Sequence, residues 1–220
     1  KYLGVIQGQY RACHRMIFNP IVLAVPGVQS LKPYQPGKGI AELEREIGVS
    51  NIVKLASNEN PRTVGSPVWD AIKEILPDLS RYPDGGGYRL KRALAQQLGV
   101  RPNQITLGNG SNDVLEMLAR AFVQARQKVV VSEHSFAVYS LVAKAIDSEL
   151  YVTPAVNWGH DLTGMRQAID SNTRLVFIAN PNNPTGTWIS KQDLEAFLNS
   201  IPNHVLVVLD EAYFEYVEED

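Results

Sequence analysis

Three residues that can bind a ligand stand at or just after the ends of apolar runs: Ser111, Asn183 and Asp210. Asp210 ends the run LVVLD at 206–210, whose lack of polar–apolar alternation is typical of a strand buried on both faces. In open α/β sheets, ligands bind outside the carboxyl ends of the strands, so a carboxylate there is placed to contact one. An acid at a strand end can equally cap a helix or face solvent, so Asp210 needs support from its neighbours.

The segment around Ser111 combines an expected strand, a turn and a helix. Residues 105–107 predict a short strand, residues 108–110 form a Gly-Asn-Gly turn, and apolar residues recur at helical spacing from Val114 to Phe122. Ser111 suits the N-cap, and the N–H groups of a first helical turn have no acceptor within the helix. Such a helix start binds anions, most naturally phosphate, although an ordinary capped helix accounts for the pattern equally well.

Asn183 belongs to the segment NPNNPTG at 180–186, which directly follows the apolar run at 174–179. Its two prolines and terminal glycine predict a rigid, non-helical loop. Four of its side chains can donate or accept hydrogen bonds, so the loop presents fixed polar groups to a ligand. We expect Ser111, Asn183 and Asp210 to lie on one rim of the sheet, because ligand-binding groups of such sheets gather at the carboxyl ends of the strands.

The elements that must position these residues alternate along the chain. Apolar runs at 128–131, 150–153, 174–179 and 206–209 predict strands, and helical patterns occur at 114–122, 139–146, 161–169 and 190–198. This order predicts an α/β fold, a doubly wound and mostly parallel sheet with helices on both faces. Upstream, we expect an extended proline-rich arm at 25–39, helices at 40–47, 67–76 and 88–98, and a short strand at 52–56.

Composition limits the classes of function. A net charge of −2 over 220 residues, without a basic block, gives no electrostatic reason to expect nucleic acid or an anionic membrane surface as a partner. No uninterrupted apolar stretch is long enough to span a bilayer. The single cysteine, Cys13, allows no internal disulfide and fits a reducing compartment, so we expect a cytoplasmic protein. No histidine or cysteine spacing predicts a metal site.

As a set, the motifs resemble those of a known family. NPNNPTG, LDEAY at 209–213 and GNGSND at 108–113 are similar to motifs in the large domain of fold-type I pyridoxal-phosphate aminotransferases. LKPYQPG at 31–37, LASNENP at 55–61, RYPD at 81–84 and SFAVY at 135–139 narrow the resemblance to histidinol-phosphate aminotransferases. The resemblance covers about residues 19–215. It implies pyridoxal 5'-phosphate as cofactor, and transamination between histidinol phosphate and 2-oxoglutarate in histidine biosynthesis.

The resemblance also assigns roles to individual residues. Asp210 would pair with the pyridinium nitrogen of the cofactor and keep it protonated, which deepens the electron sink. Asn183 and Tyr213 would hydrogen-bond the phenolic oxygen of the ring, and Ser111 and Asn112 would hold the phosphate. Phe136 would stack on the ring. Tyr82 would contact the phosphate bound by a neighbouring subunit, which implies a homodimer. Tyr34 and Asn58 would lie near the substrate.

The resemblance further implies a lysine that forms a Schiff base with the cofactor, in an SK motif beyond LDEAY. The chain ends at Asp220 without that motif, and Lys144 and Lys191 lie on expected helices that do not match it. On this interpretation the sequence is an N-terminal fragment that does not transaminate by itself. We expect residues 1–15 to be a non-native or disordered leader that ends before Met16, residues 16–48 an arm with a short helix, and residues 49–220 the N-terminal part of the cofactor-binding large domain.

Two alternatives stay open. One is a related enzyme, either an aromatic-amino-acid aminotransferase or a pyridoxal-phosphate decarboxylase or lyase of the same fold. The other is a non-catalytic binding protein that retains half of a cofactor site. In every case, a sheet with an uncovered edge and exposed apolar surface predicts aggregation or poor solubility of the chain as given.

Overall fold

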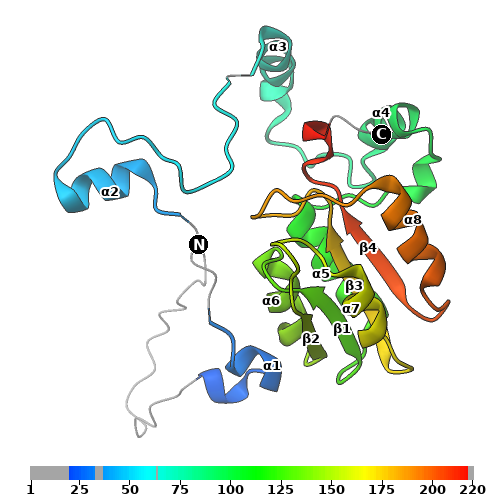
Figure 1. Ribbon diagram of the computed structural model, residues 1–220. Helices are drawn as coiled ribbons and strands as arrows, with labels where there is room; N and C mark the ends of the chain where they lie inside the picture. Colours follow the sequence, from blue (N-terminus) through cyan, green and yellow to red (C-terminus); the bar gives the residue numbers. More distant parts are fainter. Residues whose placement is uncertain (1–19, 33–36, 63, 218–220) are drawn as a thin grey trace, which may run out of the picture. The chain divides into compact units, whose positions relative to one another are not determined.

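The computed structural model describes residues 20–32, 37–62 and 64–217 (Figure 1). These residues divide into two units, one made of 20–32 and 111–217 and the other of 37–62 and 64–110. The expected leader at 1–15 and the expected substrate-contacting residue Tyr34 lie outside the described residues.

The first unit is built on a parallel sheet. Its strands are β1 (Lys128–Ser132), β2 (Glu149–Thr153), β3 (Thr173–Ala179) and β4 (Leu206–Asp210), in the order β2-β1-β3-β4 (Figure 1). Every neighbouring pair is parallel, and the register places Ala179 beside Asp210. The four strands expected from the apolar runs are therefore confirmed, and the carboxyl ends of β3 and β4 lie side by side.

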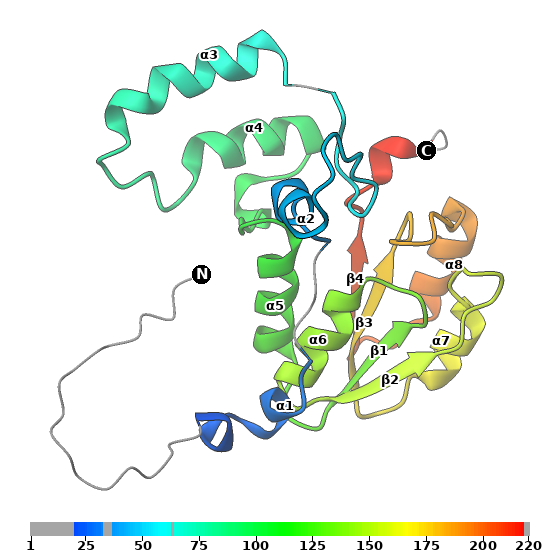
Figure 2. The ribbon, with the colours of Figure 1, turned by 90° about the vertical axis from the view of Figure 1, so that its left-hand side faces the viewer.

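Helices cover both faces of this sheet, as predicted (Figure 2). The helices α5 (Ser111–Phe122) and α6 (Ala137–Ala145) pack on one face, whereas α7 (Leu162–Ala168) and α8 (Lys191–Ser200) pack on the other. Successive strand residues alternate between two apolar clusters, because side chains along a strand point to opposite faces. Leu175 and Phe177 join the cluster with α5 and α6, and Val176 joins the cluster with α7 and α8.

Charged side chains lie at the amino end of the sheet, opposite the carboxyl ends of β3 and β4. Lys128, in β1, forms an ion pair with Asp170 and lies 3.7 Å from a carboxylate oxygen of Glu149. Asp170 also accepts hydrogen bonds from the backbone N–H groups of Asn172 and Thr173. The Lys128 ammonium is the main cause that lowers the pKa of Asp170 to about 2. These bonds tie the loop before β3 to the start of β1.

Among its described residues, the second unit contains three α-helices, α2 (Ile40–Ile47), α3 (Ser66–Ile75) and α4 (Tyr88–Leu98), at the positions expected. Short 3-10 helices follow at Leu76–Asp78 and Pro102–Gln104. Asp84 accepts hydrogen bonds from the backbone N–H groups of Tyr88 and Gly86, 2.7 and 2.9 Å away, and these lower the pKa of its carboxyl group. The side chain thus satisfies the N–H group of Tyr88, the first residue of α4, from just outside the helix.

Three expectations about local structure are wrong. Residues 52–56 and 105–107 are not strands, because a strand needs a hydrogen-bonded neighbour and neither segment has one among the described residues. Ile105 nevertheless has an extended backbone, with φ −109° and ψ 125°. The proline-rich arm expected at 25–39 is not extended throughout, because it contains the short helix α1 (Pro26–Gln29); a 3-10 helix at Pro20–Leu23 precedes it. Within α1, Gly27 is buried so closely against α6 that a Cβ there would lie 2.0 Å from the carbonyl oxygen of Lys144.

Two features are absent from the part of the chain that the structure describes. It contains no helix that is both long and apolar enough to cross a membrane. It also contains no group of three or more histidine, cysteine, aspartate or glutamate side chains placed to hold a metal ion.

Candidate functional site

A small cavity of about 60 Å³ lies at the carboxyl ends of β3 and β4. The expected convergence of Ser111, Asn183 and Asp210 is present, because all three line this cavity. They come from three separate segments: the start of α5, the loop after β3 and the end of β4. The other lining residues are Phe136, Ala179, Pro181, Ala212 and Tyr213.

Asp210 is held in place by both its backbone and its side chain. As the last residue of β4, it accepts a backbone hydrogen bond from Asn180, with an N···O distance of 3.0 Å. One carboxylate oxygen, Oδ1, accepts from the backbone N–H of Ala212 at 3.2 Å. The other, Oδ2, accepts from the hydroxyl of Tyr139 at 2.7 Å. The acid is therefore directed by two donors on different oxygens and does not cap a helix.

Tyr139 is the main residue that the sequence did not single out. The helical pattern placed it on the sheet-facing side of a helix, and its ring is indeed fully buried, at 0% exposure. It stacks on Phe177, with ring centroids 4.8 Å apart and planes 4° apart. Burial first, and then the bond to Asp210, raise the pKa of Tyr139, so its hydroxyl remains a proton donor. The bond joins residues 71 positions apart, and no local pattern indicates it.

The loop that carries Asn183 is fixed by its neighbours. The side-chain amide of Asn182, a residue only 3% exposed, donates to the carbonyl oxygen of His134 at 3.1 Å and to Oγ1 of Thr185 at 2.7 Å. Asn180 forms two further bonds with the backbone of Ile189, at 2.8 and 3.1 Å. The polar loop predicted from its prolines is therefore anchored by its own asparagines.

At the start of α5, the structure differs from the expectation by one residue. Ser111 is the first helical residue, preceded by Gly110 in a left-handed conformation with φ +78°, so Ser111 is not the N-cap. Helix ends are commonly shifted by a residue. Asn112 is exposed and is not among the residues that line the cavity, and Asp113 places an acidic group in the first turn. The N–H groups of a first helical turn have no acceptor within the helix, so this helix start still favours an anion.

The other predicted contacts lie elsewhere. Tyr82 and Asn58 belong to the second unit, and both are exposed, Tyr82 completely so at 101%. Neither lines the cavity. Their expected roles, in the neighbouring subunit and at the substrate, therefore stay predictions.

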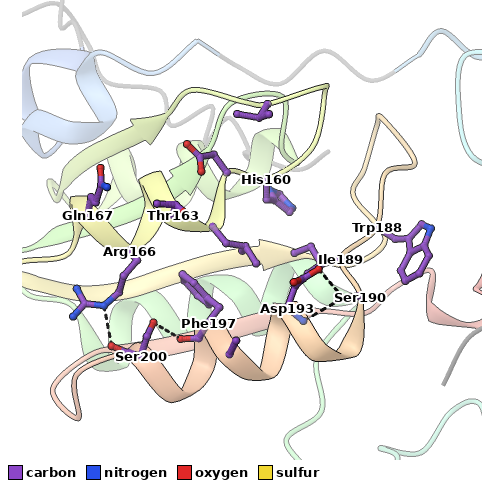
Figure 3. Close-up of a pocket in the computed structure, with 14 residues that line it drawn as sticks. His160, Thr163, Arg166, Gln167, Trp188, Ile189, Ser190, Asp193, Phe197 and Ser200 are labelled. Carbon is purple, nitrogen blue, oxygen red and sulfur yellow. Dashed lines mark hydrogen bonds between the residues drawn. The ribbon is translucent and has the colours of Figure 1, made fainter.

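A larger groove, with a volume of about 730 Å³, runs between α7 and α8 (Figure 3). Its polar side chains are largely bonded to their own neighbours: Arg166 donates to the carbonyl oxygen of Ser200 at 2.8 Å, and Ser190 donates to Asp193 at 2.7 Å. Its two acids are engaged at helix starts, because Asp161 accepts from the backbone N–H of Gly164 and Asp193 accepts from the hydroxyl of Ser190. We therefore place the candidate site in the smaller cavity, on chemistry rather than size.

A partly buried histidine, His160, borders that groove. Nε2 of His160 lies 2.9 Å from the carbonyl oxygen of Ala179, whereas Nδ1 is buried without a hydrogen-bond partner. Burial is the first cause that lowers the pKa of His160, so the ring is held neutral. A neutral ring bonded to a carbonyl must carry its proton on Nε2.

The cavity offers a carboxylate, an amide, two hydroxyl groups, an aromatic ring and a helix start. The carboxylate can neutralise a cationic ring nitrogen, the amide and hydroxyl groups can bond ring oxygens, and the helix start can bind a phosphate. Pockets for drug-sized ligands have volumes of about 300–1000 Å³, so this cavity receives one edge of a small ring. The arrangement suits a flat, phosphorylated, cationic heterocycle.

Comparison with known proteins agrees with this chemistry. Residues 50–220 match the family model for aminotransferase class I and II. Histidinol-phosphate aminotransferase 1 of Idiomarina loihiensis is 55% identical over 203 residues, which are 92% of this chain and 55% of that protein. Histidinol-phosphate aminotransferase 2 of Pseudomonas fluorescens (strain ATCC BAA-477) is 56% identical over 200 residues, which are 90% of this chain and 54% of that protein. The chain thus spans about half the length of these curated relatives.

Solved structures give the same relationship. The crystal structure of histidinol-phosphate aminotransferase from Sinorhizobium meliloti in complex with pyridoxal-5'-phosphate aligns with a TM-score of 0.78 and 32% identity, covering 87% of this chain and 51% of that one. Aspartate aminotransferase from Thermotoga maritima, at 22% identity and a TM-score of 0.73, covering 81% of this chain and 51% of that one, shares the fold. Since the family model covers most of the sequence, the chain belongs to the aminotransferase class I and II family.

Proposed function

We propose that the protein is a pyridoxal-phosphate-dependent aminotransferase that transfers the amino group of histidinol phosphate to 2-oxoglutarate. Identities of 55% and 56% to proteins named histidinol-phosphate aminotransferase support this substrate. The single structural observation that carries the proposal is the shared cavity of Ser111, Asn183 and Asp210. A chain with only a structural role has no need to gather an acid, an amide and a helix start at one point.

The residues around the cavity fit the cofactor by charge and by hydrogen-bonding type. Asp210 would hold the proton on the pyridinium nitrogen, since a carboxylate next to a cationic N–H favours the charged form. Asn183 and Tyr213 would orient the phenolic oxygen. Ser111 and the first N–H groups of α5 would bind the phosphate. Phe136 would cover one face of the ring, for which an aromatic side chain without a hydroxyl suffices.

When bound, pyridoxal phosphate supplies the electron sink that stabilises negative charge on the substrate carbon. The described side chains would hold and polarise it through the charge of Asp210 and the hydrogen bonds of Asn183 and Tyr213. None of the eight residues that line the cavity is a lysine. Covalent attachment and proton transfer at the substrate carbon would therefore fall to other residues of the protein.

The finer assignments are proposals that rest on the motifs. Residues 49–220 would belong to the cofactor-binding domain of a cytoplasmic homodimer. The exposed ring of Tyr82 would contact the phosphate bound by the neighbouring subunit, while Asn58 and Tyr34 would lie near the substrate. Asn112 would assist Ser111 from the first turn of α5, although it does not line the cavity.

An assay of the protein as its gene encodes it tests the proposal. With 2-oxoglutarate as acceptor and added pyridoxal phosphate, we expect glutamate formation from histidinol phosphate, with a preference of roughly tenfold or more over phenylalanine as donor. A preference for phenylalanine would point to an aromatic-amino-acid aminotransferase. Binding of the cofactor without turnover of either donor would favour the non-catalytic alternative.

A further inference from the structure

We propose that Tyr139 is a positioning residue of the cofactor site, a single buried side chain that fixes both the carboxylate of Asp210 and the ring of Phe136. The inference rests on the proposed function, because it concerns how the chain would hold pyridoxal phosphate. It goes beyond that function, since Tyr139 does not line the cavity and would touch neither cofactor nor substrate.

The contact with Asp210 restricts how the carboxylate can turn. The Tyr139 hydroxyl donates to Oδ2 at 2.7 Å, and the Ala212 N–H donates to Oδ1 at 3.2 Å. Two donors on different oxygens oppose rotation of the carboxylate about its bond to Cβ. Each carboxylate oxygen has about two lone-pair sites, so each keeps capacity for a ligand. The acid is thus held in one orientation and still has acceptor sites for a ligand.

The ring of Tyr139 is itself immobilised. It is 0% exposed and lies parallel to Phe177, a fully buried residue at the centre of the sheet. Its position on α6 is fixed by the packing of Val142 and Ala143 in the same apolar cluster. Because a buried tyrosine has only two side-chain torsions, this packing sets the direction of the hydroxyl. The sheet thereby determines the orientation of the acid.

Tyr139 also supports the aromatic side chain at the cavity. The rings of Phe136 and Tyr139 meet edge to face, with centroids 5.7 Å apart and planes 89° apart. The backbone N–H of Tyr139 donates to the carbonyl oxygen of Phe136 at 3.1 Å, which holds the two residues one helical turn apart. Edge-to-face pairs are a favoured aromatic geometry. One residue therefore connects the acid with the ring that would lie over the cofactor.

A neutral donor is suited to this position. A lysine or arginine next to Asp210 would neutralise the carboxylate and compete with a cationic ring nitrogen, whereas a hydroxyl stabilises the ionised acid and adds no charge. Burial raises the pKa of Tyr139, so the hydroxyl keeps its proton in the neutral pH range. Tyr139 therefore places no competing positive charge beside Asp210.

The test compares two ligands on the protein as its gene encodes it: pyridoxal phosphate and its 1-deaza analogue, in which C–H replaces the ring nitrogen. Tyr139→Phe keeps the ring and removes the hydroxyl. We expect this variant to bind pyridoxal phosphate about tenfold more weakly, because a hydrogen bond to a charged group is lost, and to bind the analogue within about twofold of the unmodified protein. Tyr151→Phe, which removes a hydroxyl from the half-exposed Tyr151 in β2, is the matched control and should change neither affinity.

A double-mutant cycle with Asp210→Asn provides the second measurement, with folding of each variant followed by thermal unfolding. If Tyr139 acts through the charge of Asp210, Tyr139→Phe should change the affinity for pyridoxal phosphate by less than about twofold in the Asp210→Asn background. Equal weakening of both ligands, or no weakening of either, would overturn the positioning role. If the unmodified protein binds neither ligand, the proposed function itself fails, and the two failures are thereby distinguished.

Discussion

Asp210 supplies the formal negative charge of the candidate site. It pairs with β3 through its backbone, accepts from Tyr139 and Ala212 through its carboxylate, and still lines the cavity. Its charge can therefore act on a bound cationic ring while its position is set by the sheet. No other residue that lines the cavity carries a formal charge at neutral pH.

Replacement of Asp210 by asparagine should remove that charge and preserve the shape of the side chain. We expect cofactor-dependent turnover to fall by about 10²–10³-fold, the range seen when a preorganised electrostatic group is removed. Asp193→Asn, in the groove between α7 and α8, is the control and should leave turnover unchanged. Steady-state rates at saturating pyridoxal phosphate measure the turnover of each variant. Equal turnover of both variants would refute a role for Asp210.

His160 predicts a pH dependence of stability. Because burial lowers the pKa of His160 in the folded protein below its ordinary value of 6.5, the unfolded chain takes up the proton first as pH falls. Its contribution to the free energy of unfolding is therefore complete above about pH 6.5 and is lost as pH falls through the folded pKa. Melting temperatures measured from pH 8 to pH 5 should fall less steeply for His160→Gln than for the unmodified chain. His204→Gln, at an exposed histidine, should keep the original slope.

The motifs identified five of the residues that line the cavity but not Tyr139, which holds Asp210 from outside the lining. Ser111, Phe136, Asn183, Asp210 and Tyr213 were all expected, because each belongs to a segment with a recognisable pattern, and all five line the cavity. Tyr139 was not, since its hydrogen bond to Asp210 spans 71 positions and its spacing is that of any sheet-facing helix residue. Asn112 was expected from its place next to Ser111, but it is exposed and is not among the residues that line the cavity.

At the scale of elements, burial explains which predictions succeeded. The runs at 128–131, 174–179 and 206–209 became β1, β3 and β4, because continuous apolar sequence suits strands covered on both faces. The segments 52–56 and 105–107 have similar composition but pair with no strand in the described residues. A segment forms a strand only when it hydrogen-bonds to a second segment, so the sequence of one apolar run does not show whether it has such a partner.

The loop between β3 and α8 should depend on Asn182. Replacing it by alanine leaves the carbonyl oxygen of His134 and the hydroxyl of Thr185 without this donor. We expect the free energy of unfolding to fall by about 1–3 kcal/mol, because buried polar groups lose their partner. Asn203→Ala, at an exposed position, should change it by less than about 0.5 kcal/mol. Urea denaturation measures both, and equal stability of the two variants would contradict the anchoring role.

At the scale of the whole molecule, the sheet presents edges. Among the described residues, β2 and β4 each pair on one side only. Tyr151 and Val152, in β2, are 43% and 47% exposed, and Leu55 and Val53 in the second unit reach 89% and 79%. Unpaired strand edges and exposed apolar side chains favour association between chains.

The 220-residue chain as given should therefore self-associate. Size-exclusion chromatography with light scattering should show aggregates or oligomers at micromolar concentration, and Val152→Lys should reduce them, because a charge on an edge strand opposes pairing. Leu198→Lys on α8 makes the same charge change away from an edge, at a residue 40% exposed, and should have the smaller effect. A monomeric chain that unfolds cooperatively would show that the edges do not drive association.

The central claim is that one carboxylate, one amide and one helix start hold a phosphorylated pyridine ring between them. A crystal structure of the protein with bound pyridoxal phosphate tests it most directly. We predict the ring nitrogen at about 2.7–2.9 Å from a carboxylate oxygen of Asp210, as in charge-assisted hydrogen bonds, with the phosphate at the start of α5 and the phenolic oxygen facing Asn183. A ring bound in the groove between α7 and α8, or one whose nitrogen faces away from Asp210, would contradict the claim.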